Sequence, residues 1–121
     1  MPPRGERAGG YPRRHRFTTR GSFAPVLRGG RKIRGQLATL HVAASPGGVS
    51  RFGVALTRKL VSSAVHRNRV KRGLRELFRR HRAKAMGVDC VVMLRERVDA
   101  LSIPGVVREV ALLLDRIEPQ P

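Results

Sequence analysis

Several residue types are scarce in this chain, and each scarcity excludes a class of protein. The 121 residues include one cysteine, no tryptophan, and eight acidic residues against 26 lysines and arginines. The single Cys90 excludes an intramolecular disulfide and a multi-cysteine zinc site. Because Cys90 stands in the apolar run at 88–94, we expect a buried strand residue rather than a nucleophile.

Long hydrophobic runs are also missing. No apolar stretch approaches the length of a membrane span, and the N-terminus lacks the apolar core of a signal peptide. The default expectation is therefore a soluble protein of the reducing cytoplasm, with no membrane partner. With 40% hydrophobic residues over this length, the chain should fold as one domain around one modest core.

The shortage of acids leaves a formal net charge of +18. Self-repulsion of this size destabilises a compact protein, so we expect a neutralising polyanion as partner. Arginine supplies most of the charge, and its planar guanidinium forks onto phosphate and stacks on bases, which favours nucleic acid. A high-GC genome also enriches arginine, so composition alone leaves both explanations open.

The ends of the chain differ in composition from its middle. Residues 1–16 are rich in proline, glycine and arginine, which predicts a disordered basic arm. A folded domain should follow over 17–117, with a short tail at 118–121. The first helix of this domain is expected to be short, capped by Thr18 or Thr19, and ended by a glycine pair.

The remaining patterns predict a small sheet covered by helices. Two alternating runs, 36–45 and 51–57, flank a Pro-Gly-Gly turn and look like an antiparallel hairpin. The nearly continuous apolar run at 88–94 is typical of a strand in the middle of a sheet. A final amphipathic helix is predicted over 103–117, with Ser102 as its N-cap. The fold class is therefore α+β.

We also predict one long helix from Ser62 or Ser63 to about Lys84. Its apolar residues recur at helical spacing: Val70, Leu74 and Leu77. At 100° per residue, the opposite side carries a polar and cationic cluster: Asn68, Lys71, Arg72, Arg75, Arg79 and Arg82.

A solvated face held by salt bridges is the alternative explanation of this cluster. It needs acids near the cations, and Glu76 is the only acid in residues 65–82. Arg72 and Arg80, each four residues away, could share Glu76, which leaves the other cations for a polyanion. Gly73, in mid-helix, indicates either close packing against the sheet or a neutral accident.

Catalytic patterns are absent from the sequence. The eight acids do not pair in a way that predicts general acid–base chemistry. No nucleophile-elbow serine and no phosphate-binding glycine loop occurs, and the histidines lack the neighbours of a metal site. We therefore expect no catalytic residue and no metal ligand in this chain.

A family resemblance becomes visible in the long helix and its surroundings. The likeness to the signature helix of the bacterial ribonuclease P protein subunit rests on Arg67-Asn68-Arg69, Val70-Lys71-Arg72, Arg75-Glu76 and Phe78. Residues 51–59, Ala64, Phe23 and the run at 88–98 also resemble that family, so the similarity covers about 17–117.

This resemblance implies a particular fold. It is a two-layer α/β sandwich with elements in αβββαβα order, of the ribosomal protein S5 domain 2-like type. Its βαβ crossover would be left-handed, against the usual right-handed rule. The crossover would run from the strand at 52–57 through the long helix to the strand at 88–94.

The resemblance also implies a function as the protein subunit of ribonuclease P. The partners would be the ribonuclease P RNA and precursor tRNA, with no stable protein partner. The RNA would remove the 5′ leader and hold most of the Mg²⁺ that this hydrolysis needs. Residues facing the catalytic RNA would be Arg58, Lys59, Arg67, Asn68, Arg69, Lys71, Arg72, Arg75 and Arg79. A cleft between the first helix and the sheet would hold the leader, at Phe23 and Leu27.

Two other functions remain open from the sequence. A ribosomal or other structural RNA-binding protein would also present a basic helix. DNA binding is a third option, but no short helix and turn precede the long helix, which disfavours a helix-turn-helix.

Overall fold

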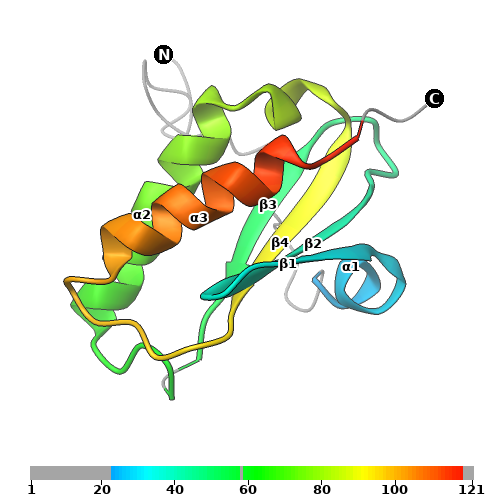
Figure 1. Ribbon diagram of the computed structural model, residues 1–121. Helices are drawn as coiled ribbons and strands as arrows, with labels where there is room; N and C mark the ends of the chain where they lie inside the picture. The colour runs from blue at the N-terminus through cyan, green and yellow to red at the C-terminus, as the bar shows by residue number, and fades with distance from the viewer. Residues whose placement is uncertain (1–22, 58, 119–121) are drawn as a thin grey trace, which may run out of the picture.

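The computed structural model describes residues 23–57 and 59–118 (Figure 1). Its elements are α1 (Ala24–Gly29), β1 (Arg31–Arg34), β2 (Ala38–Ala44), β3 (Arg51–Ala55), α2 (Ala64–Arg80), the 3-10 helix η3 (Arg82–Ala85), β4 (Val88–Leu94) and α3 (Ile103–Asp115). The expected αβββαβα order is confirmed. The arm expected at 1–16 lies outside the described residues, and the domain bounds 17–117 and 118–121 stay predictions.

The four strands form one sheet in the order β1-β2-β4-β3. Strand β2 is antiparallel to both β1 and β4, whereas β3 is parallel to β4. The expected hairpin between β2 and β3 is therefore wrong, because β4 lies between them. Strand β4 is buried along nearly its whole length, so it gains most from a central place with layers on both faces.

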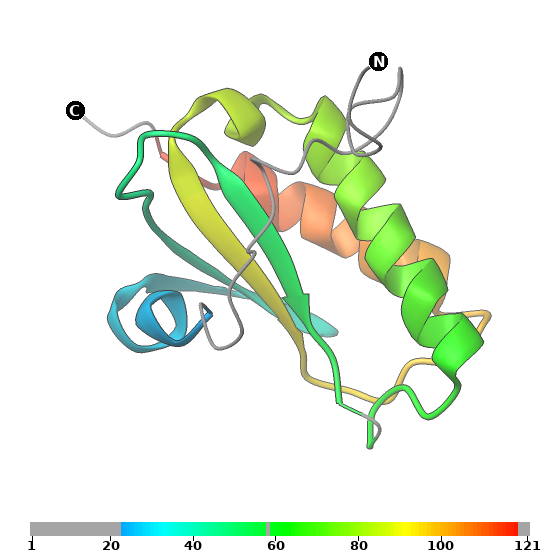
Figure 2. The same ribbon diagram turned by 180° about the vertical axis from the view of Figure 1, so that it is seen from behind.

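The β3–α2–β4 segment is the crossover that the resemblance implied. It joins two neighbouring parallel strands through the long helix. Figure 2 shows the β3 edge of the sheet with α2 on one side of it, and the connection is left-handed. The crossover places one side of α2 on the sheet and leaves the other side outward.

The main core lies between the sheet and the two long helices. Helices α2 and α3 cover one face of the sheet, and α1 lies over the other face (Figures 1 and 2). Side chains Val70, Leu74 and Phe78 of α2 are fully buried, and the Phe78 ring stacks on Phe52 of β3 with centroids 4.8 Å apart. Leu77, expected on this face, is partly buried at its edge.

Both ends of α2 have identifiable causes. At the start, the Ser63 hydroxyl accepts a hydrogen bond from the His66 backbone N–H at 3.3 Å, which confirms the expected cap. The helix ends at Arg80, earlier than expected. The chain turns there because the His81 Nε2 lies 2.6 Å from the Asp115 carboxylate, and Arg82 donates to the Asp115 carbonyl oxygen at the end of α3.

The short helix α1 begins later than expected. It starts at Ala24 with Phe23 at the N-cap, so the expected cap at Thr18 or Thr19, outside the described residues, is wrong for this helix. Pro25 stands in the first turn, where its missing N–H leaves no hydrogen bond unmade. Gly30 ends the helix, as predicted.

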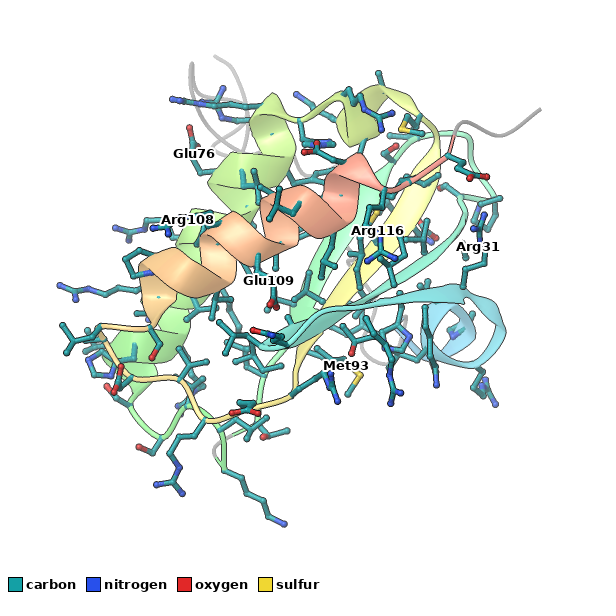
Figure 3. The ribbon with its side chains drawn as sticks, viewed as in Figure 1. Arg31, Glu76, Met93, Arg108, Glu109 and Arg116 are labelled. Atoms are coloured by element: carbon teal, nitrogen blue, oxygen red, sulfur yellow. The ribbon has the colours of Figure 1, made fainter. Side chains whose placement is uncertain are left out.

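Glu109 ties α3 to the turn between β1 and β2. Its carboxylate accepts hydrogen bonds from the backbone N–H groups of Gln36, Leu37 and Ala38 at 2.8–3.2 Å. Gly35 permits this approach, because a Cβ there would lie 2.7 Å from the Glu109 carboxyl carbon. Figure 3 shows Glu109 pointing from α3 toward this turn.

Candidate nucleic-acid interface

The outward side of α2 carries most of the residues expected to face RNA. Asn68, Arg69 and Arg72 are exposed. Arg67, Lys71, Arg75 and Arg79 are half-buried at the flanks. The three exposed side chains lie on the side of α2 opposite the buried Val70 and Leu74, and the core fixes the direction in which they point.

Arg67 contributes hydrogen bonds to the local backbone as well as positive charge. Its Nη1–H group donates to the carbonyl oxygens of Val61 and Ser62, both at 2.9 Å. These carbonyls belong to the segment that leads into α2. Arg67 therefore holds that segment against the first turn of the helix, a contact that sequence reasoning did not anticipate.

Glu76 neutralises two cations near the end of α2. It accepts two hydrogen bonds from Arg79, at 2.5 and 3.1 Å, and forms an ion pair with Arg80 at 2.9 Å. The Arg79 guanidinium is the main reason that the pKa of Glu76 is lowered from its ordinary value. Arg72 does not share Glu76, contrary to expectation. Its place is taken by Arg79, which lies three residues after Glu76 on the helix.

The loop before α2 places Lys59 beside the start of the helix. Lys59 is exposed in a turn where the N–H groups of Leu60 and Val61 both donate to the Thr57 carbonyl oxygen. The Val98 N–H donates to the Leu60 carbonyl oxygen at 2.9 Å and anchors this turn to the loop after β4. Arg58, also predicted to face RNA, lies outside the described residues.

The predicted leader cleft involves the opposite face of the sheet. Phe23 and Leu27 are half-buried on α1, and the Leu27 N–H donates to the Phe23 carbonyl oxygen at 3.0 Å. One helical turn separates the two side chains, so they share a face of α1. Their contact with a leader stays a prediction.

A cavity of about 280 Å³ lies on this same face, and we call it the cleft pocket. It is lined by Lys32, Arg34, Thr39, His41, Met93, Leu94 and Arg95. Neither Phe23 nor Leu27 lines it. In Figure 3, Met93 points away from α3, toward the side of the sheet on which α1 lies. Three of the residues that line this pocket, Lys32, Arg34 and Arg95, are cationic.

His41 is the functional candidate that sequence reasoning missed. Its side chain is buried at 6% exposure in the cleft pocket, and its Nδ1 atom has no hydrogen-bond partner among the described residues. Burial, with a smaller contribution from the charge of Lys32, lowers the pKa of His41 from 6.5. The available signal was the alternation of β1 and β2, since Lys32, Arg34, Thr39 and His41 all fall on the non-core positions.

Three ionisable groups of β3 and β4, Arg51, Asp89 and Cys90, have structural roles. Asp89 is 2% exposed and receives two hydrogen bonds from the Arg51 guanidinium, at 2.6 and 2.9 Å. Burial, with the nearby Asp89 charge, raises the pKa of Cys90 to about 12. Cys90 is therefore a protonated thiol inside β4, which confirms the expected buried strand residue.

Within residues 23–57 and 59–118 there is no cluster of three or more His, Cys, Asp or Glu side chains able to hold a metal ion. The helices in the same part of the chain are all too short or too polar to cross a membrane.

Known proteins share both the sequence and the fold. A sequence model of the family described as Ribonuclease P matches residues 11–118. The ribonuclease P protein component of Nitrosomonas europaea is 33% identical over 105 residues, covering 87% of this chain and 88% of that protein. The component of Chromohalobacter salexigens is 37% identical over 112 residues, covering 90% and 86%.

Two solved structures superpose on the described elements. The ribonuclease P protein from Thermotoga maritima is 30% identical, with a TM-score of 0.67 over 85% of this chain and 97% of that chain. The Staphylococcus aureus protein has a TM-score of 0.71 over 84% and 93%, and at 20% identity it supports the fold alone. Because the sequence match and the shared fold both span most of the chain, this protein belongs to the ribonuclease P protein family.

Proposed function

We propose that the protein is the protein subunit of ribonuclease P. In this proposal α2 binds the catalytic RNA, the α1 face of the sheet holds the 5′ leader of precursor tRNA, and the RNA cleaves the leader off with Mg²⁺. The observation that carries the proposal is the outward side of α2. Its exposed Asn68, Arg69 and Arg72 belong to the family's signature string and are held in place by a buried opposite side.

The role of the protein here is electrostatic and positional. Two RNAs repel each other, and a chain of net charge +18 between them lowers that repulsion. The leader-side cations, Lys32, Arg34 and Arg95, surround a hollow suited to an unpaired strand. Magnesium would be held mainly by the RNA, where it supplies the activated water and neutralises charge at the phosphate.

Stimulation of cleavage at low magnesium tests this proposal. The protein is mixed with the ribonuclease P RNA of its own genome and with precursor tRNA, and the rate of leader removal is compared with RNA alone. We expect faster cleavage with the wild-type protein. Absence of stimulation together with tight binding to ribosomal RNA would instead support the structural RNA-binding alternative.

Paired variants show whether α2 carries the effect. Arg69→Ala with Arg72→Ala removes two exposed charges from the outward side, and neither residue forms an ion pair within the described part of the chain. We expect this pair to weaken binding of the catalytic RNA by about tenfold or more, with an unchanged unfolding temperature. Arg67 is left intact because it also holds the Val61 and Ser62 carbonyls.

A further inference from the structure

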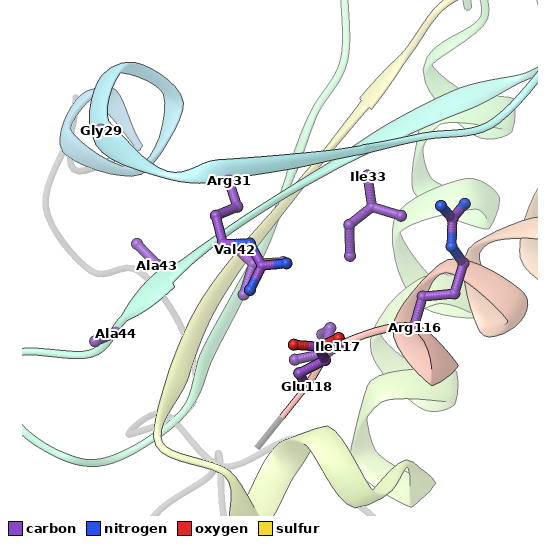
Figure 4. Close-up of a pocket in the computed structure, with 9 residues that line it drawn as sticks. All are labelled: Gly29, Arg31, Ile33, Val42, Ala43, Ala44, Arg116, Ile117 and Glu118. Atoms are coloured by element: carbon purple, nitrogen blue, oxygen red, sulfur yellow. The ribbon is translucent and has the colours of Figure 1, made fainter. Parts of the chain in front are cut away.

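A second cavity, of about 230 Å³, lies on the core side of the sheet, and we call it the edge pocket. It opens between the outer strand β1, the end of β2 and the residues that follow α3 (Figure 4). None of its lining residues belongs to α2 or to the cleft pocket. The function proposed above therefore leaves this cavity unused.

The floor of the edge pocket is apolar and already ordered by the core. Ile33, Val42 and Ile117 line it, and their side chains are between 4% and 9% exposed. Each belongs to the main hydrophobic cluster, so the floor keeps its shape without a ligand. An uncharged, flat group could lie on this floor without any rearrangement of the core.

The rim of the pocket carries two guanidinium groups from distant parts of the chain. Figure 4 shows Arg31 and Arg116 on the two sides of the Ile33 side chain. Arg31 comes from the start of β1, and Arg116 follows the last turn of α3. Neither forms an ion pair with any residue in the described ranges. The carboxylate of Glu118 also lines the pocket.

We propose that the edge pocket binds one unpaired nucleotide of an RNA, with the base on the apolar floor and its phosphate between Arg31 and Arg116. Guanidinium groups donate in parallel to phosphate oxygens, and two of them on opposite sides clamp one phosphate. The Glu118 carboxylate disfavours a second phosphate and accepts from an N–H group on a base edge. Sequence-sensitive RNA contacts of this kind use bases that have left the helical stack.

An RNA suits the pocket better than a free small anion. The inference rests on the proposed function, in which RNA already contacts α2 and the cleft pocket. A strand held at those surfaces reaches a third site as an intramolecular event, so a shallow pocket binds it at high effective concentration. A net charge of +18 adds long-range attraction for the same polyanion.

Two arginine variants, one at the C-cap of α3 and one within α3, distinguish a specific phosphate contact in the edge pocket from general electrostatic attraction. Arg116→Ala removes a pocket guanidinium, whereas Arg108→Ala removes an exposed charge from the middle of the same helix. Figure 3 shows Arg108 pointing outward from α3 on the side away from Arg116. Binding to ribonuclease P RNA and to precursor tRNA is measured by filter retention. We expect Arg116→Ala to weaken binding to one of these RNAs by about tenfold and Arg108→Ala by about twofold or less.

A double-mutant cycle measures the coupling between Arg31 and Arg116, which a general loss of positive charge would not produce. If Arg31 and Arg116 hold one phosphate, the loss in Arg31→Ala with Arg116→Ala is smaller than the product of the single losses. Arg31→Ala with Arg108→Ala should be multiplicative. Equal effects of Arg108→Ala and Arg116→Ala, with both cycles multiplicative, would overturn the pocket.

A charge-neutral variant tests the floor. Ala44 is exposed at the end of β2 and lines the pocket, so Ala44→Phe fills the hollow without removing a charge or a core contact. We expect several-fold weaker binding and an unchanged slope of affinity against salt. Unchanged binding rules out a base on the floor. If the wild-type protein does not bind ribonuclease P RNA, the proposed function is wrong. If the wild-type protein binds and the pocket variants bind equally well, only the inference about the edge pocket is wrong.

Discussion

Single residues decide how tightly the helices and sheet are held together. Glu109 and His41 are the two clearest cases: Glu109 ties α3 to the turn between β1 and β2, and His41 is an ionisable side chain buried on the other face of the sheet. Sequence reasoning gave neither a role. Glu109 looked like one more acid on an amphipathic helix, and its partners are backbone N–H groups that no side-chain pattern reveals. His41 differs from a core residue only by its position in the strand alternation.

Removing the Glu109 charge should destabilise the domain. Glu109→Gln keeps the size of the side chain but replaces one accepting oxygen by an amide that faces backbone donors. We expect the free energy of unfolding to fall by about 2 kcal/mol, since charge-assisted hydrogen bonds are worth more than neutral ones. Urea denaturation measures this, with the exposed Glu96→Gln as control. A loss in Glu109→Gln no larger than in the control would contradict a stabilising role for the hydrogen bonds between Glu109 and the β1–β2 turn.

His41 should make the fold sensitive to mild acid. Its pKa is lowered in the folded protein by burial and by Lys32, so the unfolded chain binds the proton more readily. Stability is then lost as the pH falls below the ordinary value of 6.5. We expect the wild-type protein to lose more stability than His41→Phe between about pH 7.5 and pH 5.5. Parallel pH profiles for the two proteins would show that His41 does not titrate this way.

At the scale of the elements, periodicity predicted most of the fold. The continuous apolar run of β4 correctly predicted a strand in the middle of the sheet. The helical spacing of Val70 and Leu74 correctly predicted α2 and its buried side. The pairing of β2 with β3 was wrong because alternation identifies strands and turns but not neighbours. The pairing that the structure has instead is long-range: β2 pairs with β4 along its whole length, from Ala38 opposite Leu94 to Ala44 opposite Val88.

Gly73 tests how closely α2 and α3 pack. A Cβ at position 73 would lie 3.1 Å from the Cγ2 atom of Val107 on α3, which favours close packing over a neutral accident. That packing is against a helix rather than the sheet. We expect Gly73→Ala to stabilise a Val107→Ala background by about 1 kcal/mol through helix propensity. In the wild-type background the gain should be smaller or reversed. Equal effects in both backgrounds, measured by thermal unfolding, would mean that the helices adjust freely.

At the scale of the whole molecule, two cationic surfaces lie on opposite sides of the sheet. The main core and the sheet lie between the outward side of α2 and the cleft pocket. Sequence reasoning found the α2 surface because one helix carries it in consecutive turns. It named none of the residues that line the cleft pocket, because they come from β1, β2 and the end of β4, which are far apart in the sequence.

The two surfaces should be separable by mutation. Lys32→Ala with Arg34→Ala is expected to weaken binding of leader-bearing precursor tRNA by more than fivefold and binding of mature tRNA much less, because the leader alone would reach the cleft pocket. Identical losses for precursor and mature tRNA would argue against a leader site. The α2 pair Arg69→Ala with Arg72→Ala should instead weaken binding of the catalytic RNA.

The dependence of this binding on salt is also predictable. If six phosphates are neutralised on α2, the affinity for the catalytic RNA should fall with a log–log salt slope of about −5.

The central place of β4 has a consequence for the order in which the chain is made. Strand β3 pairs only with β4, and β2 needs β4 on its inner side. Residues 31–87 are synthesised before residues 88–94. Strands β1 and β2 can therefore pair early, whereas β3 has no partner strand until β4 has been synthesised. During that interval α2 is already synthesised without the sheet that orients it. Its arginines therefore acquire a fixed direction only late in synthesis.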